Sequence, residues 1–209
     1  MYDLQEQEQL DEFKAWWKEN GRLVITIVVV FALGAAAVQG WRYYQQTQAR
    51  QAAALYGALE ELLPGKDAKK IQETAGAILE RFPSTAYAAR AALIAAKTNY
   101  ESGEVKSAKA QLQWVIDHAL EDELRDMARL RLGGALLDEK NYAEALSLLE
   151  AKHSPAYDPL FYDLKGDLLV AQGKTAEARG AYQMALDKSD KKSNYRSLIQ
   201  VKLDALGVK

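Results

Sequence analysis

Apolar residues follow two different patterns along this chain. No charged residue occurs between Arg22 and Arg42, and the run Leu23–Gly40 is almost entirely apolar. Beyond it, apolar residues recur with the three- to four-residue spacing of amphipathic helices. The 18 residues of the run would form a helix about 27 Å long, close to the roughly 30 Å of a bilayer's hydrocarbon core. The pattern predicts an all-α protein with a single transmembrane helix at residues 23–41.

Aromatic residues flank the apolar run on both sides, as they do at the two headgroup layers of a membrane. They are Trp16 and Trp17 before it and Trp41, Tyr43 and Tyr44 after it. Ala35 and Ala37 match the cleavage pattern of a signal peptide, but residues 1–22 contain six acidic residues, unlike the short basic start of such a peptide. We therefore expect the run to be retained as an anchor.

Charges near the run predict its orientation. Three basic residues lie before it (Lys14, Lys18 and Arg22) and two just after it (Arg42 and Arg50). The excess of basic charge favours a cytoplasmic segment 1–22 and a C-terminal domain, residues 42–209, on the other side. Ala32, Ala36 and Gly40 recur every four residues, so they form one ridge on which another helix can pack. Ordinary alanine usage explains that ridge equally well.

The segment before the run has its own amphipathic pattern. Leu10, Phe13 and Trp17 share one helical face opposite acidic residues. This predicts either a short helix on membrane lipid or a partly disordered tail. Asn20-Gly21 predicts a break or kink before the span.

After the span, helical periodicity continues to Pro64-Gly65, and a second helix ends at Phe82-Pro83 because the residue before proline is driven out of helical geometry. Three further segments then share a helix, a tight turn, and a second helix with an alanine followed four residues later by a bulky side chain. The turn residues Gly103, Lys140 and Gly173 are 37 and 33 residues apart, close to the 34-residue tetratricopeptide period. These segments predict a tetratricopeptide-like α-solenoid with repeats at about 89–122, 126–159 and 159–192.

A last helix, about 194–206, is expected to cover the open end of the solenoid. Its apolar residues are Leu198, Val201 and Leu206, and Tyr195 and Lys202 accompany them.

The composition argues against catalytic and metal-binding sites. The 209 residues carry a formal charge of −2 and no cysteine, which excludes disulfides and thiolate metal sites and disfavours nucleic acid as a partner. The two histidines, His118 and His153, lack partners at metal-ligand spacing and are predicted to be solvated or to cap helices. No phosphate-binding or hydrolase motif occurs. We expect no enzymatic activity, cofactor or metal.

The inner face of the solenoid is the predicted partner-binding groove, because the first helix of each repeat lines it. By register that face displays Arg90, Leu93, Lys97, Tyr100, Met127, Leu130, Leu137, Leu160, Asp163 and Asp167. Core packing is the alternative role for each apolar member.

Several landmarks together resemble one family. They are Trp16-Trp17 with the following Lys18–Arg22, Trp41–Tyr44 after the span, the segment Asp163–Leu169 (DLKGDLL), and Gly173-Lys174. Their order resembles the YfgM family, the ancillary subunits of the bacterial SecYEG translocon, over nearly the whole chain.

The resemblance implies a single-pass protein of the bacterial inner membrane with its N-terminus in the cytoplasm and its tetratricopeptide-like domain in the periplasm. It implies the SecYEG translocon and the membrane-anchored chaperone PpiD as partners, a role in handing over exported proteins, and a link of the N-terminal segment to the regulator RcsB. A scaffold for another envelope complex is the alternative function.

Overall fold

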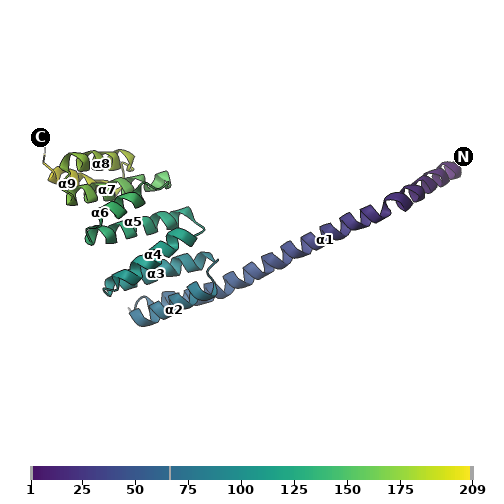
Figure 1. Ribbon diagram of the computed structural model, residues 1–209, viewed down its shortest axis with the longest axis horizontal. Coiled ribbons are helices and arrows are strands. Elements are labelled where there is room, and N and C mark those ends of the chain that lie inside the picture. Colours follow the sequence, from purple (N-terminus) through teal and green to yellow (C-terminus); the bar gives the residue numbers. More distant parts are fainter. Residues whose placement is uncertain (1, 66, 208–209) are drawn as a thin grey trace. The chain divides into compact units, whose positions relative to one another are not determined.

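The computed structural model describes residues 2–65 and 67–207, so the outermost residues of the predicted segments 1–22 and 42–209, and residue 66, lie outside the described residues. Every regular element in the described part is a helix (Figure 1). The chain divides into two compact units, one ending at Gln48 and the other beginning at Ala49. The predicted boundaries at residues 22 and 41 refer to membrane borders, and they remain predictions.

The first unit is formed by helix α1, Tyr2–Leu62, which continues into the second unit. Of the break or kink predicted at Asn20-Gly21, the break is wrong, because α1 passes through both residues. The Asn20 side-chain amide donates to the Trp16 carbonyl (3.1 Å), a bond that leaves the helix intact. A glycine inside a helix costs only about 1 kcal/mol, which a helix of 61 residues tolerates.

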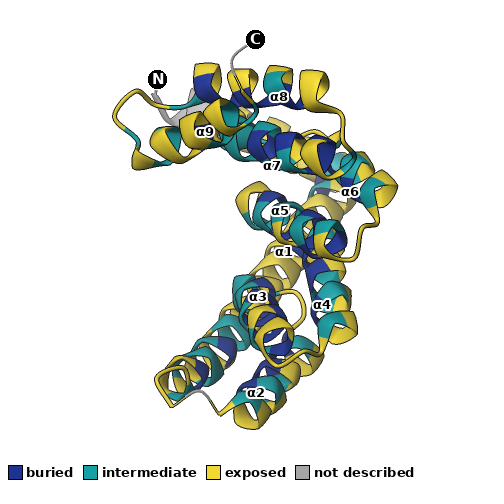
Figure 2. Cartoon of the chain, turned by 90° about the vertical axis from the view of Figure 1, so that its left-hand side faces the viewer, coloured by how far each residue is buried: buried dark blue, intermediate teal, exposed yellow. Residues whose placement is uncertain are grey.

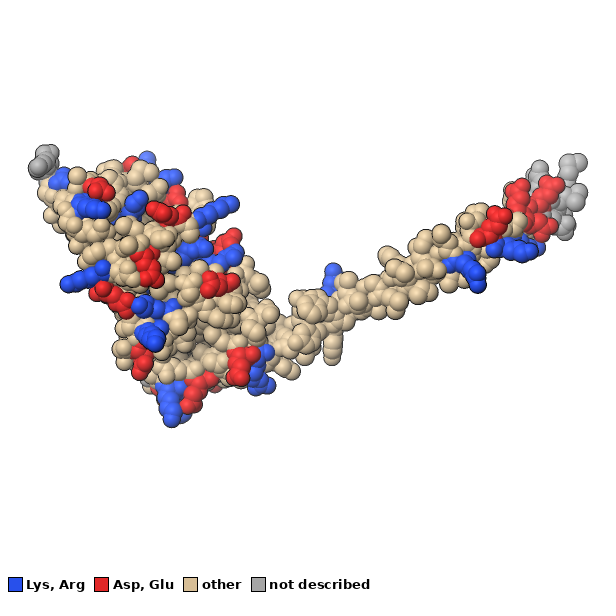
Figure 3. Space-filling view, viewed as in Figure 1, with Lys and Arg blue, Asp and Glu red and all other residues tan. Residues whose placement is uncertain are grey.

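Helix α1 contains the predicted apolar stretch. Its most apolar 18-residue window has a mean hydropathy of 2.4, and none of that window is buried. The space-filling view shows a length of this helix without charged side chains between its charged parts (Figure 3). By length and composition α1 is able to cross a membrane, which agrees with the predicted N-terminal apolar helix.

The second unit contains the end of α1 and the remaining helices. These are α2 (Ala68–Arg81), α3 (Ala86–Glu101), α4 (Val105–His118), α5 (Asp122–Asp138), α6 (Tyr142–Leu149), the short 3-10 helix η1 (Pro155–Tyr157), α7 (Asp158–Ala171), α8 (Thr175–Lys188) and α9 (Asn194–Ala205). Helix α2 begins where the Asp67 side chain accepts a hydrogen bond from the Lys70 amide (3.2 Å), and it ends before Phe82-Pro83 as predicted.

The three predicted turns are present, and they share one geometry. Gly103, Lys140 and Gly173 all have positive φ, at 82°, 62° and 75°. In each turn the next residue donates to the carbonyl five positions back: Glu104 to Asn99 (2.8 Å), Asn141 to Leu136 (2.8 Å) and Lys174 to Leu169 (2.9 Å). This pairing satisfies helix carbonyls that would otherwise lack partners. It joins α3 to α4, α5 to α6 and α7 to α8 as tight hairpins.

The hairpins stack as a curved solenoid, and buried residues lie where neighbouring helices meet (Figure 2). In this view α3 and α5 lie toward the inner side of the curve, and α4 and α6 lie toward its outer side. Small residues permit the close packing: a Cβ atom at Gly166 would overlap the Tyr182 ring, and Ala178 is fully buried. The fold is therefore the predicted all-α, tetratricopeptide-like solenoid.

Helix α9 corrects one expectation. Leu198 and Val201 do not cover the solenoid end, because their side chains point outward and are 50% and 65% exposed. The inward face instead carries Ile199, which is fully buried, with Tyr195 and Leu203 packed beside it. Leu206 packs inward as expected.

Candidate partner-binding surface

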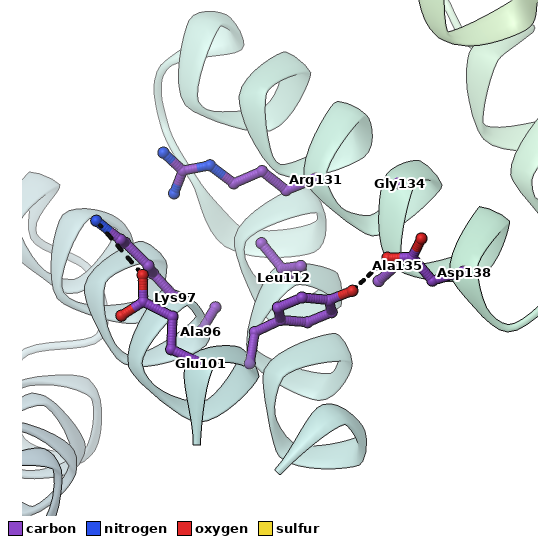
Figure 4. Close-up of a pocket in the computed structure, with 9 residues that line it drawn as sticks. Ala96, Lys97, Glu101, Leu112, Arg131, Gly134, Ala135 and Asp138 are labelled. Carbon is purple, nitrogen blue, oxygen red and sulfur yellow. Dashed lines mark hydrogen bonds and ion pairs between the residues drawn. The ribbon is translucent and has the colours of Figure 1, made fainter. Parts of the chain in front are cut away.

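A cleft of about 480 Å³ opens between α3, α4 and α5. Small and apolar residues form much of its lining, namely Ala96, Leu112, Gly134 and Ala135. Lys97, Tyr100, Glu101, Arg131 and Asp138 complete it. In Figure 4, Arg131 reaches from α5 toward the Lys97 side of the cleft, and Asp138 lies at the opposite end.

Tyr100 spans this cleft as a fixed aromatic wall. Its hydroxyl donates a hydrogen bond to the Asp138 carboxylate and so ties α3 to α5. That hydrogen bond, together with burial and the nearby carboxylates Asp138 and Glu139, raises the pKa of Tyr100. The phenol therefore stays neutral, as a donor, at physiological pH.

The charged groups of the cleft are unequally paired. Lys97 lies 3.8 Å from Glu101 (Nζ to Oε1), and Asp138 is engaged by Tyr100. Arg131 makes no ion pair or hydrogen bond to any described side chain. The cleft therefore offers an apolar floor beside an uncompensated guanidinium.

Two of the predicted groove residues, Lys97 and Tyr100, line this cleft. Leu93 does not contribute, because it is only 6% exposed and lies in the core. Met127, Leu130 and Leu137 are partly buried and pack against the same core, so the alternative role of packing applies to them. Arg90 forms an ion pair with Glu121 (2.8 Å), and Leu160 is partly buried.

Asp163 and Asp167 hold α9 rather than forming an open acidic end of the groove. Lys202 of α9 lies 2.8 Å from Asp163 Oδ2 and 2.7 Å from Asp167 Oδ2. The Tyr195 hydroxyl also donates to Asp163 (2.6 Å), and the Tyr182 hydroxyl donates to Asp167 (2.7 Å). Both aspartates are therefore engaged by α9 and Tyr182, and their role in binding a partner stays a prediction.

The pKa values in this cluster follow from its contacts. Burial raises the pKa of Tyr182 and of Tyr195, and hydrogen bonds to Asp167 and Asp163 raise them further. For Lys202, burial opposes the charge, but hydrogen bonds and attraction to both aspartates outweigh it and raise its pKa. The cluster is most stable with both phenols neutral and the ammonium charged.

Both histidines are engaged by neighbouring groups. His118 lies in the last turn of α4, where Nδ1 is 2.9 Å from the Trp114 carbonyl. His153 is not solvated as expected: its ring stacks on Phe161 with centroids 3.8 Å apart, and Nε2 lies 3.2 Å from Asp158 Oδ1. Within residues 8–65 and 67–207, whose side chains the structure describes, no cluster of three or more carboxylate or histidine side chains is arranged to hold a metal ion.

On α1, Ala32, Ala36 and Gly40 are exposed along one face. Packing of another helix on this ridge remains a prediction.

Comparison with known proteins relates this chain to one family along nearly its whole length. A family model described as a tetratricopeptide repeat-like domain matches residues 14–208. The ancillary SecYEG translocon subunit of Neisseria gonorrhoeae is 33% identical over 207 residues, which covers 97% of this chain and 98% of that protein.

The chain belongs to the ancillary SecYEG translocon subunit family.

Other members of this family are also similar to the chain over most of their length. The ancillary SecYEG translocon subunit of Haemophilus influenzae is 30% identical over 88% of this chain and 90% of its own length. That of Escherichia coli is 26% identical over 97% of each protein. The resemblance that the anchor flanks and the DLKGDLL segment indicated is thereby confirmed.

Among solved structures, MamA from Desulfovibrio magneticus RS-1 has a TM-score of 0.53 and 19% identity, covering 73% of this chain and 85% of the MamA chain. At that identity the likeness concerns the tetratricopeptide-like fold alone.

Sequence reasoning missed seven of the nine cleft residues, among them Arg131, Gly134 and Asp138 on α5. Their spacing of three and four places them on one helical face. Of the predicted groove residues on α5, Leu130 and Leu137 each come one residue before a cleft residue, which places them about 100° away around the helix. The Gly133-Gly134 pair was the available signal, because two adjacent glycines in a helix indicate close packing or an opening.

Proposed function

We propose that this family member is a non-catalytic, membrane-anchored adaptor of the SecYEG translocon. In this proposal its solenoid docks a PpiD-like chaperone and assists the hand-over of exported proteins. Residues 1–22 lie in the cytoplasm, α1 crosses the inner membrane, and the solenoid lies in the periplasm. The observation that carries the proposal is the near full-length similarity to named ancillary translocon subunits, in a chain whose α1 is apolar enough to span a bilayer.

The two units of the chain suit separate tasks. The exposed apolar side chains of α1 fit lipid or another transmembrane helix, so this helix is the proposed contact with the translocon. The cleft between α3 and α5 is the proposed contact with the chaperone. Tetratricopeptide-like solenoids commonly use such concave surfaces to bind other polypeptides.

The N-terminal segment is proposed to lie at the lipid interface. Phe13 stacks with Trp16 and Trp17, with centroids 6.2 Å and 6.1 Å away, and all three rings are exposed. Clustered aromatic rings favour the headgroup region. The link of this segment to RcsB rests on the sequence resemblance alone.

Affinity purification of the full chain in mild detergent, at native expression level, tests the adaptor function. SecYEG subunits and the chaperone should both co-purify with the chain. A chain truncated after the anchor, at residue 48, should retain the translocon and lose the chaperone. Recovery of another envelope complex without SecYEG would overturn the proposal and favour the alternative scaffold function.

A further inference from the structure

The α3–α5 cleft has a glycine, Gly134, on its α5 wall, at a position where packing does not require it. A Cβ atom at Gly134 would meet no other atom within 4 Å. At the adjacent Gly133, by contrast, a Cβ atom would lie 2.9 Å from Leu164 Cδ2, so that glycine permits α5 and α7 to pack. Glycine destabilises a helix interior relative to almost any other residue. Gly134 therefore weakens α5 without a packing reason, and what it provides is open space in the cleft.

The walls of that space carry side chains suited to binding. Tyr100 is 39% exposed, although its hydroxyl is fixed by Asp138 on the facing helix. An aromatic ring that is held in place loses little conformational freedom when a partner packs against it. Tyrosine and arginine are also among the residues that dominate binding energies at interfaces. Tyr100 and Arg131 thus frame an apolar floor of Ala96, Leu112 and Ala135.

The charges specify the occupant further. Both cleft carboxylates already have a partner: Asp138 accepts from Tyr100, and Glu101 lies beside Lys97. Arg131 has no such partner among the described side chains, and it extends toward the Lys97 side. Guanidinium groups bind carboxylates through two parallel hydrogen bonds. An acidic group on a partner is therefore favoured at this side of the cleft, and a basic one is disfavoured.

From these observations we propose that the cleft binds a polypeptide segment of the chaperone that inserts one large apolar side chain over Gly134 and places a neighbouring carboxylate on Arg131. The proposal rests on the adaptor function above and specifies the chemistry of its docking segment. The apolar side chain supplies most of the affinity, and the carboxylate fixes the direction of the segment.

The decisive variant is Gly134→Leu, which fills the cleft from within. Because nothing lies near the Gly134 Cβ position and leucine favours helix, the thermal midpoint should equal or exceed that of the wild type. Gly76→Leu in α2 is the matched control, since Gly76 also has no atom within 4 Å of its Cβ position and lies outside the cleft. In mild detergent, Gly134→Leu should reduce chaperone recovery at least tenfold and leave SecYEG recovery unchanged. Gly76→Leu should leave both unchanged.

A charge reversal tests the carboxylate. Arg131→Glu should reduce chaperone recovery on the order of tenfold, whereas Lys106→Glu, an exposed reversal on α4, should not. The loss should be reversed when the acidic residue of the docking segment, located by crosslinking, is changed to lysine.

The outcomes separate the two levels of the proposal. If the wild type recovers neither chaperone nor translocon, the adaptor function and this inference both fail. If the wild type recovers the chaperone and folded Gly134→Leu recovers it equally, the adaptor function stands and the cleft is not the docking site. If only Arg131→Glu still recovers the chaperone at the wild-type level, the cleft binds the apolar side chain and the proposed contact between Arg131 and a carboxylate is wrong.

Discussion

At the scale of single residues, Lys140 occupies a conformation that two glycines occupy in the equivalent turns. Its φ of 62° is the only positive value found at a non-glycine residue in the described part of the chain. A left-handed backbone costs an L-residue with a Cβ atom about 1 kcal/mol. The hydrogen bond from Asn141 to Leu136 keeps the turn closed despite that cost.

Lys140→Gly should therefore raise the free energy of unfolding by roughly 0.5–1 kcal/mol, since relief of strain exceeds the added flexibility of the unfolded chain. Urea denaturation followed by circular dichroism measures this change. Gly173→Ala is the converse control and should lower stability by a similar amount. A less stable Lys140→Gly would show that the lysine side chain contributes a contact that outweighs the strain.

Gly166 is a residue at which even a methyl group is excluded. Gly166→Ala should lower the free energy of unfolding by about 1–3 kcal/mol, because its Cβ atom overlaps the Tyr182 ring and the third hairpin must move apart. Gly180→Ala, on the second helix of that hairpin, has open space and should be neutral or stabilising. Equal thermal midpoints for the wild type and Gly166→Ala would contradict the packing described.

The buried cluster under α9 predicts a pH dependence. The pKa values of Tyr182, Tyr195 and Lys202 are all raised in the folded chain above their ordinary values of 10.0 and 10.5. Their contribution to stability is complete below about pH 10 and is lost as the pH rises further, because the unfolded chain releases these protons first. Thermal midpoints should therefore fall above pH 10, and less steeply for the double variant Tyr182→Phe/Tyr195→Phe.

At the scale of elements, helix ends and turns were predictable because local chemistry determines them. Phe82-Pro83 ends α2, and glycine forms two of the three hairpin turns. The continuity of α1 through Asn20-Gly21 was not predictable in this way, because a single glycine only weakens a helix that the residues on both sides extend. Leu130 and Leu137 on α5 and Leu198 and Val201 on α9 were assigned to the wrong face, because a helix with apolar residues on several sides does not reveal which of them its neighbours bury.

Helix α9 depends on Lys202 more than on its exposed apolar residues. Lys202→Met should lower the free energy of unfolding by about 3 kcal/mol, because it leaves Asp163, which is 5% exposed, without its cation. Val201→Ser, one residue away on the outward face, should change stability by less than about 0.5 kcal/mol. Chemical denaturation of the two variants checks this contrast. A larger effect of Val201→Ser would mean that another surface covers α9.

At the scale of the whole molecule, the fold class was predictable and the binding chemistry was not. The uncharged run Leu23–Gly40 and the turn spacing determine an apolar helix and a solenoid. The cleft depends instead on which of two adjacent glycines contacts α7, and only the packed structure distinguishes Gly133 from Gly134.

The proposed orientation makes a direct prediction for the intact protein. A protease added to spheroplasts should degrade the solenoid and leave an N-terminal fragment protected, because residues 1–22 then lie on the cytoplasmic side. Epitope tags at the two ends report the fragments on immunoblots. Full protection of the C-terminal tag, with cleavage after detergent as the control, would contradict the orientation.

The stacking of each hairpin mainly on its neighbours in the chain has a consequence for the time course of folding. Contacts that are local in sequence close short loops, so they form quickly and need no distant segment to be present. As the chain is synthesised, α2 and α3 can pack on the end of α1 before α7 has been made. Helix α9 arrives last, and until it docks, Asp163 has neither Lys202 nor Tyr195 beside it. In the interval before that event, the cluster that Asp163 and Asp167 form with α9 is incomplete, so the end of the solenoid at α7 and α8 lacks its cover.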